Sequence, residues 1–412
     1  MEPAAQNLAS DTKTGKKPFW FLFVLCVLVV TAVAVWLQRS SARPLPATAQ
    51  TETPATELAV PTSTQKDSFY FLADKYLGRV PLPDEVRGIY LTAYTAGSSR
   101  FDELLAYAVK SHLNAFVIDV KLDNGSLAFA PNDPNISKYA TEDLPLADLD
   151  GLLAKLKGKN IYRIARIFVM RDGAFGKLNP EVSLKDTKGM VWRDKTGTPW
   201  LDPAAPQVAD YAVELAREVY ARGFDEVQFD YVRYPTDGNV SQIVYPYYDE
   251  KTPKALVMKK FFDTVSGELR KDGIPVSYDF YGMTCWRTDD FGIGQRLAGV
   301  HDAAVAISPM VYPSHYPDGF EGFANPSEHP YDIVKLSLDK GMDILKIDFP
   351  QLDATAARRK MRPWIQDFDL GAEYDAPKIQ AQIRAARDAG AGGWLIWNAR
   401  NVYTPTDYAA EH

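Results

Sequence analysis

Cysteine and histidine are scarce in this chain of 412 residues. The 2 cysteines, Cys26 and Cys285, cannot form a disulfide framework, so a hydrophobic core must hold the fold together. The 5 histidines have neither the His-x-His nor the His-Glu-x-x-His spacing of zinc sites. The formal net charge is −7 and no long basic run is present, which argues against nucleic-acid binding. We therefore expect no metal, no cofactor and no nucleic-acid partner.

One long apolar segment, from Pro18 to Leu37, contains no charged residue. About 20 residues at ~1.5 Å each are enough to cross the core of a bilayer. Because lysines precede it and arginines follow it, the charge bias is slight. We expect a cytoplasmic tail at 1–17, an uncleaved membrane anchor at 18–37 and the remaining chain outside the cytoplasm. A cleaved signal peptide is the alternative, although its apolar core is usually shorter.

The organisation changes after the anchor. Residues 38–80 begin with a stretch rich in Pro, Thr, Ala and Ser, which predicts an extended linker. Residues 83–405 alternate between strand and helix patterns. The predicted strands are Gly88–Thr92, Ala115–Lys121, Tyr162–Val169, Glu226–Tyr231, Val276–Tyr281, Ala303–Val311, Arg362–Phe368 and Gly393–Asn398. The predicted helices are Phe101–Ser111, Leu146–Leu156, Gln207–Ala221, Lys254–Lys271, Tyr331–Lys340 and Pro377–Asp388.

Glycines support several of the predicted helix ends: Gly223, Gly273, Gly341 and Gly390. Eight strands that alternate with helices predict an α/β fold, the closed (β/α)8 TIM barrel. An open doubly wound sheet is the alternative, but no glycine-rich phosphate turn follows the first strand.

The segment Gly223–Pro235 contains a predicted strand that ends in polar groups. Alternation places Val227, Phe229 and Tyr231 toward the helices, and Gln228 and Asp230 toward the barrel axis. Parallel barrels carry their catalytic groups at the carboxyl ends of the strands, which is where Asp230 stands.

The same alternation directs further polar and aromatic side chains to this mouth of the barrel. They are Tyr90, Asp119, Lys121, Arg166, Asp279, Tyr281, Tyr312, Trp364 and Gln366, with Trp397 or Asn398 from the last strand, whose phase is ambiguous. Long loops after the second, third and sixth strands add aromatic or imidazole rings, at Trp192, Trp200, His315, Tyr316 and Phe320. Such rings suit the apolar faces of sugars, although rings in loops are as often packed locally.

Three of these side chains are carboxylates, Asp119, Asp230 and Asp279. Glycoside cleavage requires one carboxyl group to protonate the leaving oxygen and a second to attack or to activate water. We expect Asp230 to be the nucleophile or base and Asp279 to be the acid. The remaining candidates would bind the sugar: Tyr90, Lys121, Arg166, Gln228, Arg233, Tyr281, Tyr312, His315, Trp364, Gln366, Trp397 and Asn398. In the alternative interpretation, Asp119 or Asp230 only neutralises Lys121, Arg166 or Arg233.

Three segments carry a family resemblance: Phe229–Pro235, Pro309–Tyr316 and Arg362–Phe368. Phe116–Lys121 and Gly393–Asn398 add to it. They resemble a bacterial family of glycoside hydrolase TIM barrels whose activity is not settled, over about residues 85–403. More distantly, 223–231 is similar to a strand of chitinase-like and α-amylase-like barrels. The resemblance implies a (β/α)8 fold, a polysaccharide substrate and an extracellular setting. Val232 departs from the chitinase-like motif, which has a glutamate there, and Gln228 departs from the arginine of α-amylases.

The hypothesis is therefore a membrane-anchored hydrolase of a cell-envelope or extracellular polysaccharide. A non-catalytic barrel that tethers such a glycan at the cell surface is the alternative from another class. A third possibility is a lyase or aldolase that uses Lys121 as a Schiff-base amine, which we disfavour because Asp119 and Asp123 would raise the pKa of that lysine.

Overall fold

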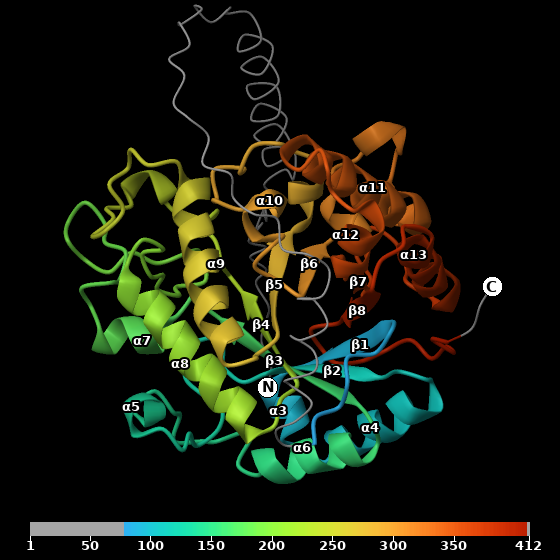
Figure 1. Cartoon of the computed structure of the whole chain (residues 1–412), viewed down its shortest axis with the longest axis horizontal. Helices are drawn as coiled ribbons and strands as arrows, with labels where there is room; N and C mark the ends of the chain where they lie inside the picture. The colour runs from blue at the N-terminus through green and yellow to red at the C-terminus, as the bar shows by residue number, and fades with distance from the viewer. Residues whose placement is uncertain (1–77, 410–412) are drawn as a thin grey trace, which may run out of the picture. The chain divides into compact units, whose positions relative to one another are not determined.

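The computed structural model describes residues 78–409, which form a closed barrel of parallel strands in the order β1 to β8, with β8 paired to β1 (Figure 1). The strands are β1 Val86–Leu91, β2 Ala115–Asp119, β3 Tyr162–Phe168, β4 Glu226–Asp230, β5 Val276–Tyr281, β6 Ala306–Met310, β7 Trp364–Gln366 and β8 Gly393–Trp397. The predicted barrel is confirmed, and each predicted strand overlaps an observed one.

The predicted tail, anchor and most of the linker, residues 1–77, lie outside the described residues. Within 78–409, no helix combines the length and the apolar character that crossing a membrane requires. The membrane anchor at 18–37 therefore stays a prediction.

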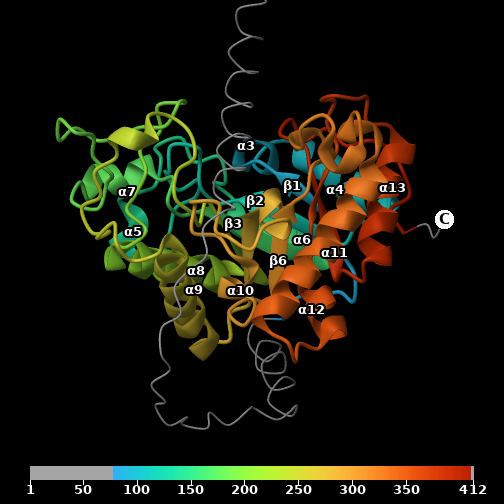
Figure 2. The ribbon, with the colours of Figure 1, turned by 90° about the horizontal axis from the view of Figure 1, so that it is seen from above.

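Helices surround the barrel. They are α3 Ala93–Ala96, α4 Arg100–Lys110, α5 Pro134–Ser137, α6 Leu149–Gly158, α7 Gly173–Leu178, α8 Pro206–Arg222, α9 Lys254–Lys271, α10 Leu297–Val300, α11 Pro330–Asp348, α12 Ala354–Lys360 and α13 Ala376–Asp388. Figures 1 and 2 both show α8 beside α9 on one flank and α11 beside α13 on the other. Helix α9 matches its predicted bounds. Proline in the first turn and Gly223 at φ 122° after the last turn explain where α8 begins and ends.

Two of the sequence predictions were wrong in detail. Gly341 does not end a helix, because α11 continues through it to Asp348. Its missing side chain instead allows close packing, since a Cβ atom there would lie 3.2–3.3 Å from Cys285, Leu297 and Met361. Helix α12, which precedes β7, was not predicted.

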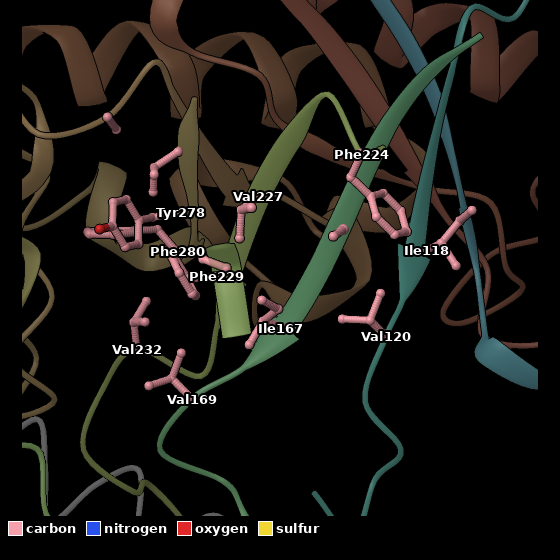
Figure 3. Close-up of a cluster of buried hydrophobic side chains, with 14 of the residues drawn as sticks. Ile118, Val120, Ile167, Val169, Phe224, Val227, Phe229, Val232, Tyr278 and Phe280 are labelled. Carbon is pink, nitrogen blue, oxygen red and sulfur yellow. The ribbon is translucent and has the colours of Figure 1, made fainter. Parts of the chain in front are cut away.

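Alternation along the strands separates two apolar layers. Phe116, Ile118, Val227 and Phe229 belong to the larger cluster between strands and helices, part of which Figure 3 shows. A smaller cluster fills the barrel interior, with Val117, Ile164, Trp364 and Leu395 among its members. The phase of β8 is thereby settled, because Leu395 and the half-buried Trp397 face inward while Trp394 and Ile396 face the helices.

A buried ion pair closes the base of the barrel. Glu226 at the start of β4 accepts hydrogen bonds from both terminal nitrogens of Arg362, one of them at 3.0 Å. Ser277 Oγ and Tyr162 Oη also donate to this carboxylate. Because these four buried polar side chains bond to one another, the lower interior is a packed plug and not a channel.

Candidate active site

Three aspartates from different strands converge on one arginine at the carboxyl end of the barrel. Arg166 of β3 donates from Nη1 to Asp119 Oδ1 at 2.7 Å and from Nη2 to Asp230 Oδ2. Its Nε lies 3.4 Å from Asp279 Oδ2. The register accounts for part of this arrangement, since Arg166 lies opposite Asp119 on one side and Gln228 on the other. The predicted convergence of the three carboxylates is therefore present.

The three carboxylates differ in their access to solvent. The side chains of Asp119 and Asp230 are 8% and 10% exposed, whereas that of Asp279 is 0% exposed. Asp279 Oδ1 accepts a hydrogen bond from Trp364 Nε1 at 2.6 Å, and its Oδ2 has no hydrogen-bond donor among the described residues. Asp119 and Asp230 therefore reach the mouth, while Asp279 lies beneath it.

Burial also raises the pKa values of two of these carboxyl groups, Asp279 and Asp119. Desolvation raises the pKa of Asp279 well above its usual range, and the neighbouring Asp230 charge adds to this. Desolvation also raises the pKa of Asp119, to about 6, against the opposing effects of Arg166 and the Tyr90 hydroxyl. Three carboxylates therefore compete for one guanidinium, and burial favours the protonated form of Asp279.

Aromatic rings surround this cluster. Tyr90 donates its hydroxyl to Asp119 Oδ2 and stacks on Trp397, with ring centroids 4.1 Å apart. The Arg166 guanidinium lies 4.6 Å from the Phe168 ring centroid and 5.0 Å from that of Trp397. These contacts hold the guanidinium in one orientation, so the carboxylates that it binds are also fixed.

Tyr231, the residue after Asp230, has left-handed backbone geometry, with φ at 53°. A bulky residue rarely adopts this conformation, and such strain is concentrated at functional sites. The strand consequently ends at Asp230, and the Tyr231 amide donates to Asp230 Oδ1. The Tyr231 ring packs on Phe168 and Trp200 at the mouth. The half-buried Tyr231 also packs against the larger apolar cluster, on the side where alternation placed it.

Lys121 does not join the cluster. Its ammonium group, 1% exposed, pairs with Asp172 and donates to the Phe168 carbonyl at 2.8 Å. Burial lowers the pKa of this lysine, so the expected rise caused by Asp119 and Asp123 was wrong. With its amine enclosed by Asp172 and Phe168, Lys121 joins β2 to the loop after β3.

Three other candidates are also engaged in local structure. Gln228 donates to Ser308 Oγ at 3.1 Å inside the barrel. Gln366 accepts a hydrogen bond from the Ser314 amide and donates from Nε2 to the Phe368 carbonyl at 2.8 Å. Asn398 donates to the Asp367 carbonyl and accepts from the Arg400 amide. The hydrogen bonds of these three residues join neighbouring strands and turns around the mouth of the barrel.

The remaining candidates lie nearer the surface or beside the carboxylates. Tyr281 is 40% exposed at the end of β5, and His315 is exposed with its ring 5.1 Å from that of Tyr312. Tyr312 is buried in the interior cluster, together with Trp364. Trp192, Trp200 and Tyr316 are buried, so these loop aromatics serve local packing. Within 78–409, no group of three or more His, Cys, Asp or Glu side chains has an arrangement suited to a metal ion.

The fold is a closed (β/α)8 barrel with three acidic side chains at the carboxyl end of its strands. Residues 88–403 match the family described as "Putative glycosyl hydrolase domain", and the chain belongs to that family. None of the curated proteins matches this chain.

Among solved structures, the chain is similar to the PgaB (BpsB) glycoside hydrolase domain from Bordetella bronchiseptica, with 13% identity and a TM-score of 0.52 over 79% of this chain and 95% of that one. It is also similar to a hypothetical protein from Ruminiclostridium thermocellum, with 27% identity and a TM-score of 0.41 over 46% of this chain and 96% of that one. The spore cortex-lytic enzyme SleL from Bacillus cereus matches at 11% identity and a TM-score of 0.45, over 79% and 73% of the two chains. The first of these likenesses supports the barrel fold.

Proposed function

We propose that this protein is a membrane-anchored glycoside hydrolase that cleaves a cell-envelope or extracellular polysaccharide outside the cytoplasm. The observation that carries the proposal is the convergence of Asp119, Asp230 and Asp279 on Arg166 at the carboxyl end of the barrel. Membership of the glycosyl hydrolase family supports the reaction class. The uncharged apolar run at 18–37 supports the anchor and the location.

Asp230 is the nucleophile or the base in this proposal. Arg166 and the Tyr231 amide each hold one of its oxygens, so the carboxylate is fixed in place at the mouth. Either role requires a carboxylate held in one orientation toward the sugar.

We assign the acid to Asp119, and not to Asp279 as expected from the sequence. The acid must touch the glycosidic oxygen, and Asp119 reaches the mouth whereas Asp279 is fully enclosed. A pKa of about 6 lets Asp119 donate its proton in weakly acidic solution. Protonated Asp279 would then have a supporting role, since its neutral form leaves the Arg166 charge to Asp230 and Asp119.

Asparagine variants test this assignment in the full chain against a panel of purified bacterial exopolysaccharides and envelope glycans, with release of reducing ends as the assay. We expect Asp230→Asn and Asp119→Asn each to lower turnover by about 100-fold or more. Asp279→Asn should retain most activity, because asparagine resembles the protonated acid. Asp123→Asn is the matched control, since the Asp123 side chain is 93% exposed.

The outcomes separate the competing hypotheses. Loss of activity in Asp279→Asn but not in Asp119→Asn would return the acid role to Asp279. Glycan binding without turnover in the wild type, unchanged in Asp230→Asn, would identify a tethering protein and refute the hydrolase.

A further inference from the structure

Arg233 stands three residues after Asp230, half-buried in the loop that follows β4. Its guanidinium carbon lies 5.1 Å from the centroid of the Trp200 ring and 5.5 Å from that of Tyr231. Nη1 donates to the Tyr234 carbonyl at 3.0 Å and to Thr236 Oγ1 at 3.3 Å. Two rings and two acceptors therefore fix the position of this cation at the mouth of the barrel.

The other two guanidinium nitrogens of Arg233, Nε and Nη2, have no hydrogen-bond acceptor among the described residues. Neither Nε nor Nη2 of Arg233 donates to any residue within 78–409, and neither is an enclosed atom without a partner, so both reach the surface. No carboxylate of the described chain lies within 4.0 Å of this side chain. Buried arginines elsewhere in the barrel have such partners, as Arg163 does in Asp225 and Arg362 in Glu226.

A half-buried cation without a close counter-ion is costly, and burial lowers the pKa of Arg233 accordingly. A guanidinium nevertheless stays charged at neutral pH, and its Nε–Nη2 edge matches the two oxygens of a carboxylate. Asp230 contributes a favourable charge from beyond ion-pair distance. The unused edge of Arg233 is thus suited to an anionic group brought in by a ligand.

We propose that Arg233 binds the carboxylate of an acidic sugar, so that the preferred glycan carries uronic acid units next to the cleaved bond. This inference rests on the proposed function, whose glycan it narrows to an acidic class. Without Arg233, an acidic sugar would meet the negative charges of Asp230 and Asp119, which share the single cation Arg166, so the arginine selects such a ligand by reducing a repulsion.

A different role for Arg233 predicts a different pattern. If the arginine only kept Asp230 ionised, its loss would impair reactions with neutral and acidic glycans equally. If it binds the substrate carboxylate, its loss affects acidic ligands and leaves neutral ligands unchanged. Binding measurements separate these cases without requiring turnover.

The experiment measures binding of glucuronate, galacturonate, glucose and inorganic phosphate to the full-length protein by ligand-observed NMR, for the wild type, Arg233→Met and Arg233→Lys. We expect the wild type to bind the uronates more tightly than glucose. Arg233→Met should weaken uronate binding by about 10-fold or more, because a charged hydrogen-bonded pair is lost, with glucose unaffected. Arg233→Lys should restore part of the affinity, since it keeps the charge but not the two-pronged geometry.

Arg193→Met is the matched control, because Arg193 is an exposed arginine in the neighbouring loop. Equal wild-type affinity for glucuronate and glucose, or uronate binding that survives Arg233→Met, would overturn the proposal. Phosphate binding as tight as that of the uronates would also overturn it, because the site would then recognise charge and not a carboxylate. Uronate binding lost in Arg233→Met alongside a hydrolytically inactive wild type would instead refute the proposed function and leave this site standing.

Discussion

Replacement of Asp119 by asparagine should stabilise the protein at neutral pH while it inactivates the proposed enzyme. The pKa of Asp119 is raised from 3.8 to about 6, mainly by desolvation. Because the folded-state pKa lies above the unfolded one, the contribution of this group to stability is fully present below about pH 4. It is lost as the pH rises through about 6.

The size of this change in stability follows from the shift in the pKa of Asp119. A pKa about 2 higher in the folded state, at about 1.4 kcal/mol for each pKa unit, corresponds to roughly 3 kcal/mol. Ionised Asp119 therefore makes the native state less stable by about this amount at pH 7. Asparagine keeps the size of the side chain and an oxygen for Arg166 but cannot ionise. The variant should therefore not lose this unfolding free energy as the pH rises.

Denaturant unfolding between pH 4 and 8 measures the effect, with the difference between the variant and the wild type as the readout. We expect the two unfolding free energies to be similar near pH 4 and to separate by up to about 3 kcal/mol above pH 6. The comparison cancels the contribution of a distant aspartate with a raised pKa, such as Asp367, because both proteins contain it in the same surroundings. Parallel pH profiles, or a variant less stable at pH 7, would refute the argument that burial destabilises the ionised form of Asp119.

Three further predictions concern activity and packing. If Asp119 is the acid, kcat/KM should fall as the pH rises above about 6; a rate that stays constant to pH 8 would contradict this role. Lys121→Met should lower the unfolding free energy by about 3–5 kcal/mol because it leaves Asp172 buried without its counter-ion, whereas Lys155→Met, from an exposed pair with Asp102, should cost less than about 1 kcal/mol. Similar denaturation midpoints for these two variants would disprove the difference. Gly393→Ala should lower the melting temperature sharply, because Gly393 has φ at 140° and a Cβ would overlap the backbone of Val86 where β8 meets β1. Gly267→Ala, in an open part of α9, is the control and should be neutral or stabilising.

Strand alternation made much of the barrel predictable. Burial of Val227 and Phe229 against helices, with Gln228 and Asp230 on the other face, follows from a period of two along one strand. The same rule placed Asp119 and Asp279 inside. The helix end predicted at Gly341 was wrong, because a glycine can mark the end of a helix in one context and allow close helix packing in another.

The sequence by itself determined the order of the elements, the inward face of most strands and the set of acidic residues at one mouth of the barrel. These properties are local, since each depends on residues a few positions apart. Only the tertiary structure decided which charges meet: Arg166 with three aspartates, Lys121 with Asp172, and Arg233 with none in the described chain. The tertiary structure also decided how deeply each carboxylate is buried, since the side chain of Asp279 is 0% exposed and that of Asp119 is 8% exposed. Partners and depth depend on loops and strands far apart in the chain, and no pattern within a single segment encodes the distance between two side chains.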